Sequence, residues 1–198
     1  MKRLFFSFLF LITLTACSED EMIDQTADEK TSIQNVEITD KIFSSEKQNQ
    51  EINEEELKLS IKTYLDSHTK LDQASYPFQD ILDEGEKLTK NQLEQLAEIT
   101  KLIKQNDENF SSYIAHNTLP EGYREETKRI SRYITTYNTF LAELDEVLVE
   151  LDEDLGNGKF PKVNIQPLID QSKIVNGREQ QKIEDFLNEK NIKTIAFK

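Results

Sequence analysis

The clearest hydrophobic pattern in the chain lies between residues 120 and 158. Apolar side chains recur there at spacings of four and three residues over about four and a half heptads, which is typical of a helix that packs one face against another helix. At 1.5 Å per residue such a helix would be about 54 Å long. Pro120 suits its start, and Gly156-Asn157-Gly158 predicts its end. The seam consists of Tyr123, Thr127, Ile130, Ile134, Tyr137, Leu141, Leu144, Leu148, Leu151 and Leu155.

Two further amphipathic helices are predicted before this seam. The first begins at the acidic stretch 53–56, whose charge favours a helix N-terminus, and its apolar residues recur at helical spacing as far as Leu71. A break is expected at residues 73–77, with Pro77 as the first residue of the second helix. That second helix is predicted from about 77 to 116, interrupted or kinked at Gly85.

The fold class follows from these three helices and their short connectors. Short connectors require neighbouring helices to run antiparallel. The sequence therefore predicts a mostly α fold, an antiparallel bundle of three long helices over residues 51–158. The alternative is a parallel homodimeric coiled coil through the third helix. The bundle is favoured because the first two helices also carry apolar stripes that need cover.

Residues 159–198 are predicted to form a small C-terminal extension packed on the bundle. Leu168–Val175 suits a short helix, and Asn176 suits the N-cap of another helix from Arg178 to about Lys190. Weak alternation over residues 192–197 predicts either a strand or an extended arm, so the extension is helical or α+β.

Residues 17–50 have the composition of an acidic tether. Between residues 18 and 50, nine acidic side chains stand against three lysines, and the isolated Ile and Val residues follow no period. Such a segment buries too little apolar surface to offset its ordering entropy, so a disordered tether is predicted. The alternative is a short strand or helix formed on binding by Val36, Ile38, Ile42 and Phe43.

The first sixteen residues have the pattern of a signal peptide. Lys2 and Arg3 precede thirteen almost continuously apolar residues, fewer than the roughly 20 that a membrane-spanning helix needs. Leu14-Thr15-Ala16-Cys17 resembles the lipobox of bacterial lipoproteins. The resemblance implies cleavage between Ala16 and Cys17 and a diacylglyceryl thioether on Cys17, which would anchor the protein to the extracytoplasmic face of the cell membrane. Cys17 is the only cysteine, so it has no disulfide partner in the chain.

Charge narrows the range of partners. The full chain carries a formal net charge of −14, and removal of residues 1–16 takes away two bases and no acid. The resulting mature chain, at −16, repels nucleic acid, so the expected partners are the lipid bilayer and an unidentified protein.

A short motif in the second helix resembles a known signature. Gln105-Asn106-Asp107-Glu108-Asn109-Phe110 is similar to the motif of the NDxxF lipoproteins of low-GC Gram-positive bacteria, with Asn106, Asp107 and Phe110 as the matching residues. The stretch from Val175-Asn176-Gly177-Arg178 to Phe186-Leu187 also resembles that family. The resemblance implies a membrane-anchored extracytoplasmic protein and no particular activity.

Asn106 and Asp107 interrupt a stripe that is otherwise apolar from Leu96 to Ile114. A buried amide or carboxylate costs roughly 1–3 kcal/mol unless it is hydrogen-bonded. Three interpretations remain open: a ligand or partner site, a buried polar pair that fixes helix register, and a helix break with Asp107 as a cap. For a buried pair, the candidate partners are Arg124, Arg129, Arg132 or a backbone group.

No other motif points to catalysis, a metal or a cofactor. The acidic stretch 145–154 fails the EF-hand pattern because Asn157 stands at the glycine position and Val163 at the final acid. His68 and His116 lie in no zinc motif. The tyrosines Tyr123, Tyr133 and Tyr137 suit core packing more than a pocket.

The expected function is therefore a binding or structural module, with an inhibitor or immunity-type protein as the alternative. A transporter-associated solute-binding protein or an enzyme is less favoured, because long helices with short connectors leave few loops for a site.

Overall fold

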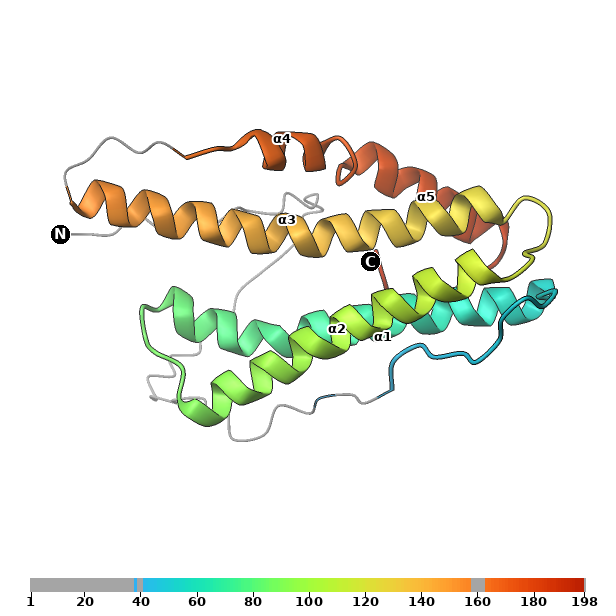
Figure 1. Ribbon diagram of the computed structural model, residues 1–198, viewed down its shortest axis with the longest axis horizontal. Helices are drawn as coiled ribbons and strands as arrows, with labels where there is room; N and C mark the ends of the chain where they lie inside the picture. The colour runs from blue at the N-terminus through green and yellow to red at the C-terminus, as the bar shows by residue number, and fades with distance from the viewer. Residues whose placement is uncertain (1–37, 39–40, 158–162, 198) are drawn as a thin grey trace, which may run out of the picture.

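The computed structural model describes residues 38, 41–157 and 163–197 (Figure 1). The predicted signal peptide, Ala16 and Cys17 lie outside these residues. Five helices follow one another along the described chain: α1 Glu54–Asp83, α2 Lys90–His116, α3 Arg124–Gly156, α4 Gln166–Ser172 and α5 Gly177–Glu189.

The three long helices run antiparallel in chain order, as the sequence predicts (Figure 1). α1 packs on α2, α2 packs on α3, and α4 and α5 pack on α3. No strand forms among the described residues; the nearest feature is an isolated parallel bridge between Glu51 and Thr118. The predicted mostly α bundle with a small C-terminal extension is therefore confirmed.

The boundary between α1 and α2 differs from the sequence prediction. α1 continues through Pro77 to Asp83 instead of ending near residue 73. Proline inside a helix costs about 3 kcal/mol or more, but Ala74 and Phe78 on either side of it are buried against α2, which offsets that cost. The chain turns at Gly85, where φ is +77°, a conformation that glycine adopts without strain. α2 then starts at Lys90 with a capping box between Thr89 and Gln92.

α3 begins slightly later than expected and ends where the sequence predicts. Pro120 to Tyr123 form a turn, with the Tyr123 N–H donating to the Pro120 carbonyl over 3.2 Å, and the helix starts at Arg124. The last residue of α3 is Gly156. The predicted single long helix is thus confirmed over nearly its full length.

Two hydrophobic clusters form the core, and α3 contributes to only one of them. The larger cluster joins the N-terminal half of α3 to α1, α2, α5 and the C-terminal arm. The smaller cluster consists of Leu71, Ala74, Phe78 and Ile99 with partly buried neighbours, all from α1, α2 or the segments beside them. The predicted seam of α3 is therefore buried as far as Ile134, while its continuation beyond Tyr137 belongs to neither cluster.

The segment 41–53 corrects the predicted extent of the tether. Phe43 and Ile52 are each only 4% exposed, and the Phe43 ring meets those of Phe110 and Tyr113 edge-on at 5.4 and 5.2 Å. The backbone of the segment bonds to the end of α2, including Ile52 N–H to the Thr118 carbonyl over 2.9 Å. Residues 41–50 thus belong to the folded domain, because a single buried phenylalanine and paired backbone groups fix a segment whose average composition is that of a coil.

The C-terminal extension follows the prediction for α5 and differs in its last residues. Asn176 caps α5 by accepting from the N–H groups of Arg178 and Glu179. α4 ends at Ser172, three residues before the predicted end. Residues 192–197 form an arm packed on the bundle and not a strand, and the arm bends and turns at residues 195–197. Ile192 and Ala196 are buried, and the Thr194 hydroxyl donates to the Asp66 carboxylate of α1 over 2.6 Å. No helix in the described part of the chain is both long and apolar enough to cross a membrane.

Candidate functional site

Asn106 and Asp107 lie in the middle of an unbroken helix, so the interpretation of a helix break is wrong. Asn106 is 0% exposed and Asp107 8% exposed, on the face of α2 that turns toward α1 and α3. Each side-chain oxygen and nitrogen of the pair has a hydrogen-bond partner, as the cost of burying a polar group requires.

Asn106 ties the segment 41–53 to the helices. Its Oδ1 accepts from the Phe43 N–H over 2.8 Å, and its Nδ2 donates to the Tyr64 carbonyl of α1 over 3.0 Å. Asn109 Nδ2 donates to the Phe43 carbonyl over 2.8 Å, so both backbone groups of Phe43 are paired with side chains of the motif. Phe110 stacks on the Tyr64 ring with centroids 4.2 Å apart. The motif residues therefore position Phe43 over the core.

Asp107 connects the three long helices through a polar network. The Tyr64 hydroxyl of α1 donates to Asp107 Oδ1 over 2.5 Å, and Asn138 Nδ2 of α3 donates to Oδ2 over 3.1 Å. His68 Nε2 lies 3.0 Å from Asn138 Oδ1. Because the Asn138 nitrogen donates to a carboxylate, its oxygen must accept, which places the proton of His68 on Nε2.

Burial dominates the electrostatics of this network. Desolvation raises the pKa of Asp107 above the ordinary value, although the bonds from Tyr64 and Asn138 and the nearby His68 act in the opposite direction. Burial also raises the pKa of Tyr64 well above its usual value, and the Asp107 carboxylate adds to that effect. The Tyr64 hydroxyl therefore keeps its proton and serves as a hydrogen-bond donor.

The network is enclosed by the helices that it joins. Tyr64 is 0% exposed and His68 6% exposed, so neither reaches a ligand at the surface in this conformation. This geometry fits the interpretation of Asn106 and Asp107 as a buried polar pair that fixes the register of the helices.

The expected arginine partners of the pair are not its partners in the structure. Arg124 donates to the Asn117 carbonyl over 3.0 Å, and Arg129 pairs with Glu126 and Glu179. The sequence left the choice open between these arginines and a backbone group, and the backbone alternative is correct for Asn106, which bonds to the Phe43 N–H and the Tyr64 carbonyl. The Asp107 carboxylate instead accepts hydrogen bonds from neutral donors on α1 and α3, Tyr64 and Asn138.

Sequence analysis did not identify two asparagines that make buried contacts: Asn138, which bonds to Asp107, and Asn117, which bonds to the segment 41–53. Asn138 directly follows Tyr137 of the apolar seam of α3, and a polar side chain at the border of a buried face needs a hydrogen-bond partner. Asn117 left no comparable signal, because it stands in a short connector. It accepts from the Gln50 N–H over 3.0 Å and donates to the Lys47 carbonyl over 2.9 Å, which fixes the second half of the segment 41–53.

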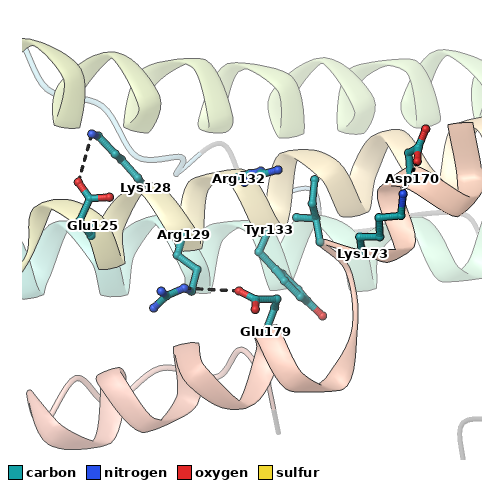
Figure 2. A pocket seen from close by; sticks show the side chains of 9 residues that line it. Glu125, Lys128, Arg129, Arg132, Tyr133, Asp170, Lys173 and Glu179 are labelled. Atoms are coloured by element: carbon teal, nitrogen blue, oxygen red, sulfur yellow. Dashed lines mark hydrogen bonds and ion pairs between the residues drawn. The ribbon is translucent and has the colours of Figure 1, made fainter.

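A cavity of about 590 Å³ forms a groove between α3 and the turn from α4 to α5 (Figure 2). Its basic side chains are mostly neutralised at close range: Lys128 pairs with Glu125 at 3.4 Å, Lys173 with Asp170 at 2.6 Å, and Arg129 with Glu179 at 3.5 Å. Arg132 makes no ion pair with the described residues. The groove therefore offers a ligand one unpaired cation at a solvent-exposed surface, where ion pairs contribute little.

The remaining sequence candidates lie apart from one another. Tyr123 and Tyr133 are buried in the core, as predicted, while Tyr137 is half-buried and its ring meets that of His68 at 6.3 Å. His116 lies at the C-terminus of α2 and bonds to Ser112. Within the described ranges no three His, Cys, Asp or Glu side chains are grouped closely enough to hold a metal ion.

No protein-family model, curated protein or solved structure matches the chain. The similarity to the NDxxF lipoproteins therefore rests on the motif residues and on the stretch from Val175 to Leu187.

Proposed function

We propose that this chain is an extracytoplasmic lipoprotein, held at the cell membrane through a diacylglyceryl group on Cys17, and that its helical domain is a binding or structural module. The observation that carries the proposal is Leu14-Thr15-Ala16-Cys17 directly after a basic start and thirteen largely apolar residues. That order of residues is the pattern of a bacterial lipoprotein signal, and it places the only thiol of the chain at the predicted cleavage point.

The chemistry of Cys17 suits this role. A cysteine sulfur is the most nucleophilic group in its segment and forms a thioether when it is alkylated. Two acyl chains anchor a protein stably, whereas a single chain binds only marginally, at about 0.8 kcal/mol per buried methylene. A diacylglyceryl thioether supplies two chains, so no membrane-spanning helix is needed.

The position of the folded domain along the chain supports the same arrangement. Twenty residues separate Cys17 from Ile38, which is partly buried against the smaller core cluster. At about 3.3–3.6 Å per residue, this spacer allows the domain to stand at most about 70 Å from the lipid surface. The domain can therefore reach partners near the membrane or beyond the headgroups.

A binding role is supported by the location of polar and apolar groups. The buried polar network from Tyr64 through Asp107 and Asn138 to His68 joins the three long helices. Several large apolar side chains are instead exposed at one end of the bundle. Exposed apolar surface is typical of sites that contact another molecule, which supports the proposed binding role.

Replacement of Cys17 tests the anchor. Cys17→Ala in the full chain is expected to abolish lipidation, so that the protein is released to the medium or remains uncleaved with its signal peptide. The measurement is fractionation of cells into membrane and medium, followed by detection of the chain and its size. Ser18→Ala, one residue further on, is the matched control and should leave the chain mature and membrane-bound. A Cys17→Ala chain that is cleaved normally and stays on the membrane would overturn the proposal.

A further inference from the structure

The C-terminal part of α3 extends beyond the helices that cover its first half. In Figure 1 the end of α3 passes the connection between α1 and α2 along the long axis of the molecule. Leu144, Leu148 and Leu151 follow one another by four and three residues, so they lie on one side of the helix. None of the three belongs to a buried cluster, and Leu148 and its neighbour Val149 are 53% and 59% exposed.

Exposed apolar residues gather at this end of the bundle. α1 ends, α2 begins and α3 ends there, while α4 lies over the middle of α3 (Figure 1). Of the nine large apolar side chains that the described residues expose most, five lie in these parts of the three long helices. They are Tyr76, Leu82, Leu93, Leu148 and Val149.

The same end is strongly acidic. From residue 133 to residue 158 the chain contains no lysine, arginine or histidine. Seven of the twelve residues from 143 to 154 are acidic. The neighbouring stretch 80–90 adds four acids and two lysines. Burial and the nearby Asp83 carboxylate raise the pKa of Asp145, and neither acid forms an ion pair with a described residue. Cations from outside the described domain would relieve this repulsion.

A second copy of the chain does not supply the positive charges that would match the acidic end of α3. The basic residues of α3, from Arg124 to Arg132, lie at its other end, where the apolar face is already covered by α1, α2 and α5. Two copies paired through their acidic ends would bring two sets of unpaired carboxylates together, and such like-charge contacts are unfavourable.

We propose that the acidic, leucine-bearing end of α3, centred on Leu148 and Val149, is a docking surface for a basic amphipathic helical segment of another protein. Apolar residues of such a segment, spaced by three and four, would continue the seam of α3, while its lysines or arginines would face the flanking carboxylates. This inference deepens the proposed binding role and does not depend on the lipid at Cys17.

The experiment uses the chain from residue 18 onward, which retains both buried clusters. The probe is a fluorescent 18-residue peptide of leucine and lysine with leucines at helical spacing, and binding is followed by anisotropy. A peptide with glutamate in place of lysine tests charge, and a peptide of the same composition without helical periodicity tests shape. The double variant Leu148→Ala/Val149→Ala tests the surface. Leu59→Ala removes a leucine that is 63% exposed on the first turns of α1 and is the matched control.

The parent is expected to bind the lysine peptide, and the double variant to bind it at least tenfold more weakly. Leu59→Ala should stay within twofold of the parent, and both control peptides should bind at least tenfold more weakly than the probe. Because exposed residues are changed, thermal melting of all variants should coincide. Equal affinity of parent and double variant, or equal binding of the glutamate peptide, would overturn the inference.

Sedimentation of the same samples without peptide measures the oligomeric state, and so tests whether a second copy of the chain occupies the surface instead. The inference predicts a monomer at micromolar concentration. A concentration-dependent dimer that the double variant abolishes would overturn it in favour of a second copy of the chain. Because the assay uses unlipidated protein, a failure here leaves the anchor at Cys17 untouched, and a failure of the anchor leaves the docking result standing.

Discussion

At the scale of single residues, the most informative side chain is Asp107. Its two oxygens accept from different helices, one from Tyr64 on α1 and one from Asn138 on α3. A carboxylate in this position costs desolvation, which its donors offset only while all of them are present. The stability of the bundle should therefore respond more to the loss of Asp107 than to the loss of its neighbours in sequence.

Asp107→Ala is expected to lower the free energy of unfolding by about 1–3 kcal/mol, because the Tyr64 hydroxyl and the Asn138 amide lose their acceptor. Chemical denaturation followed by helix content measures the change. The control is Glu108→Ala, an exposed residue on the next position of the same helix, which should stay within about 0.5 kcal/mol of the parent. Equal stability of Asp107→Ala and Glu108→Ala would contradict the role of the network.

The pH dependence of Asp107 has a definite sign. Its pKa in the folded state is raised, so the folded protein binds a proton more readily than the unfolded chain does. Protonation therefore adds stability as the pH falls from the raised folded pKa toward the unfolded value near 4. In Asp107→Asn this contribution is absent, so parent minus variant stability should rise as the pH is lowered through that window. A difference that is constant with pH would contradict the raised pKa.

At the scale of elements, two segments outside the helices complete the core. The segment 41–53 places Phe43 between Phe110 and Tyr113, and the C-terminal arm is bound to Asp66 of α1. Burial alone would raise the pKa of Asp66, but hydrogen bonds from Lys62, Thr194 and the Ile195 N–H outweigh it and lower the pKa. Both segments are held by a few particular contacts and have no regular periodicity.

Phe43→Ala is expected to cost about 3–5 kcal/mol of unfolding free energy, as a buried phenylalanine in a core does. Leu59→Ala, at an exposed position, is the matched control and should change stability little. Truncation sharpens the test, because removal of residues 18–37 should leave thermal melting almost unchanged while removal of 18–50 should lower the midpoint clearly. If both truncations melt alike, the segment 41–50 does not contribute to the fold.

Asp66→Asn tests the attachment of the C-terminal arm. The lowered pKa of Asp66 means that its charged form stabilises the fold at pH values above the unfolded pKa of about 4. This stabilisation is lost as the pH falls below 4 through the folded pKa. Parent minus variant stability, from denaturation at a series of pH values, should be constant above pH 5 and shrink below about pH 4. A difference that does not shrink would show that Asp66 carries no charge-dependent contact with the arm.

Sequence periodicity predicted that three long helices form, but it was insufficient for the boundary between α1 and α2 and for the contacts that join the helices. The seam of α3 and the cap of α5 at Asn176 are local features, so the residues that specify them stand next to each other in the chain. Pro77 was misleading because packing of Phe78 on α2 overrides a local propensity. The contacts of Asp107 with Tyr64 and Asn138 link residues that lie 43 and 31 positions apart, and no spacing rule within one helix identifies such pairs.

At the scale of the whole molecule, the chain combines a sequence that resembles a lipoprotein signal with a helical domain whose apolar residues are covered at one end and partly exposed at the other. The covered end contains the larger core cluster and both added segments. The exposed end contains the continuation of the α3 seam, together with most of the acidic residues of α3. We infer that the bilayer is contacted through Cys17 and that protein partners are contacted through the domain.

The intact mass and N-terminal sequence of the protein purified from membranes test this account most directly. The account predicts a chain that begins at Cys17 and exceeds the mass of residues 17–198 by a diacylglyceryl group, with or without a further acyl group on the new amino terminus. After proteolysis of the purified protein, the peptide that contains Cys17 should be the only one that carries the extra mass. A membrane-derived chain that begins at any other residue, or that carries an unmodified Cys17, would contradict the account.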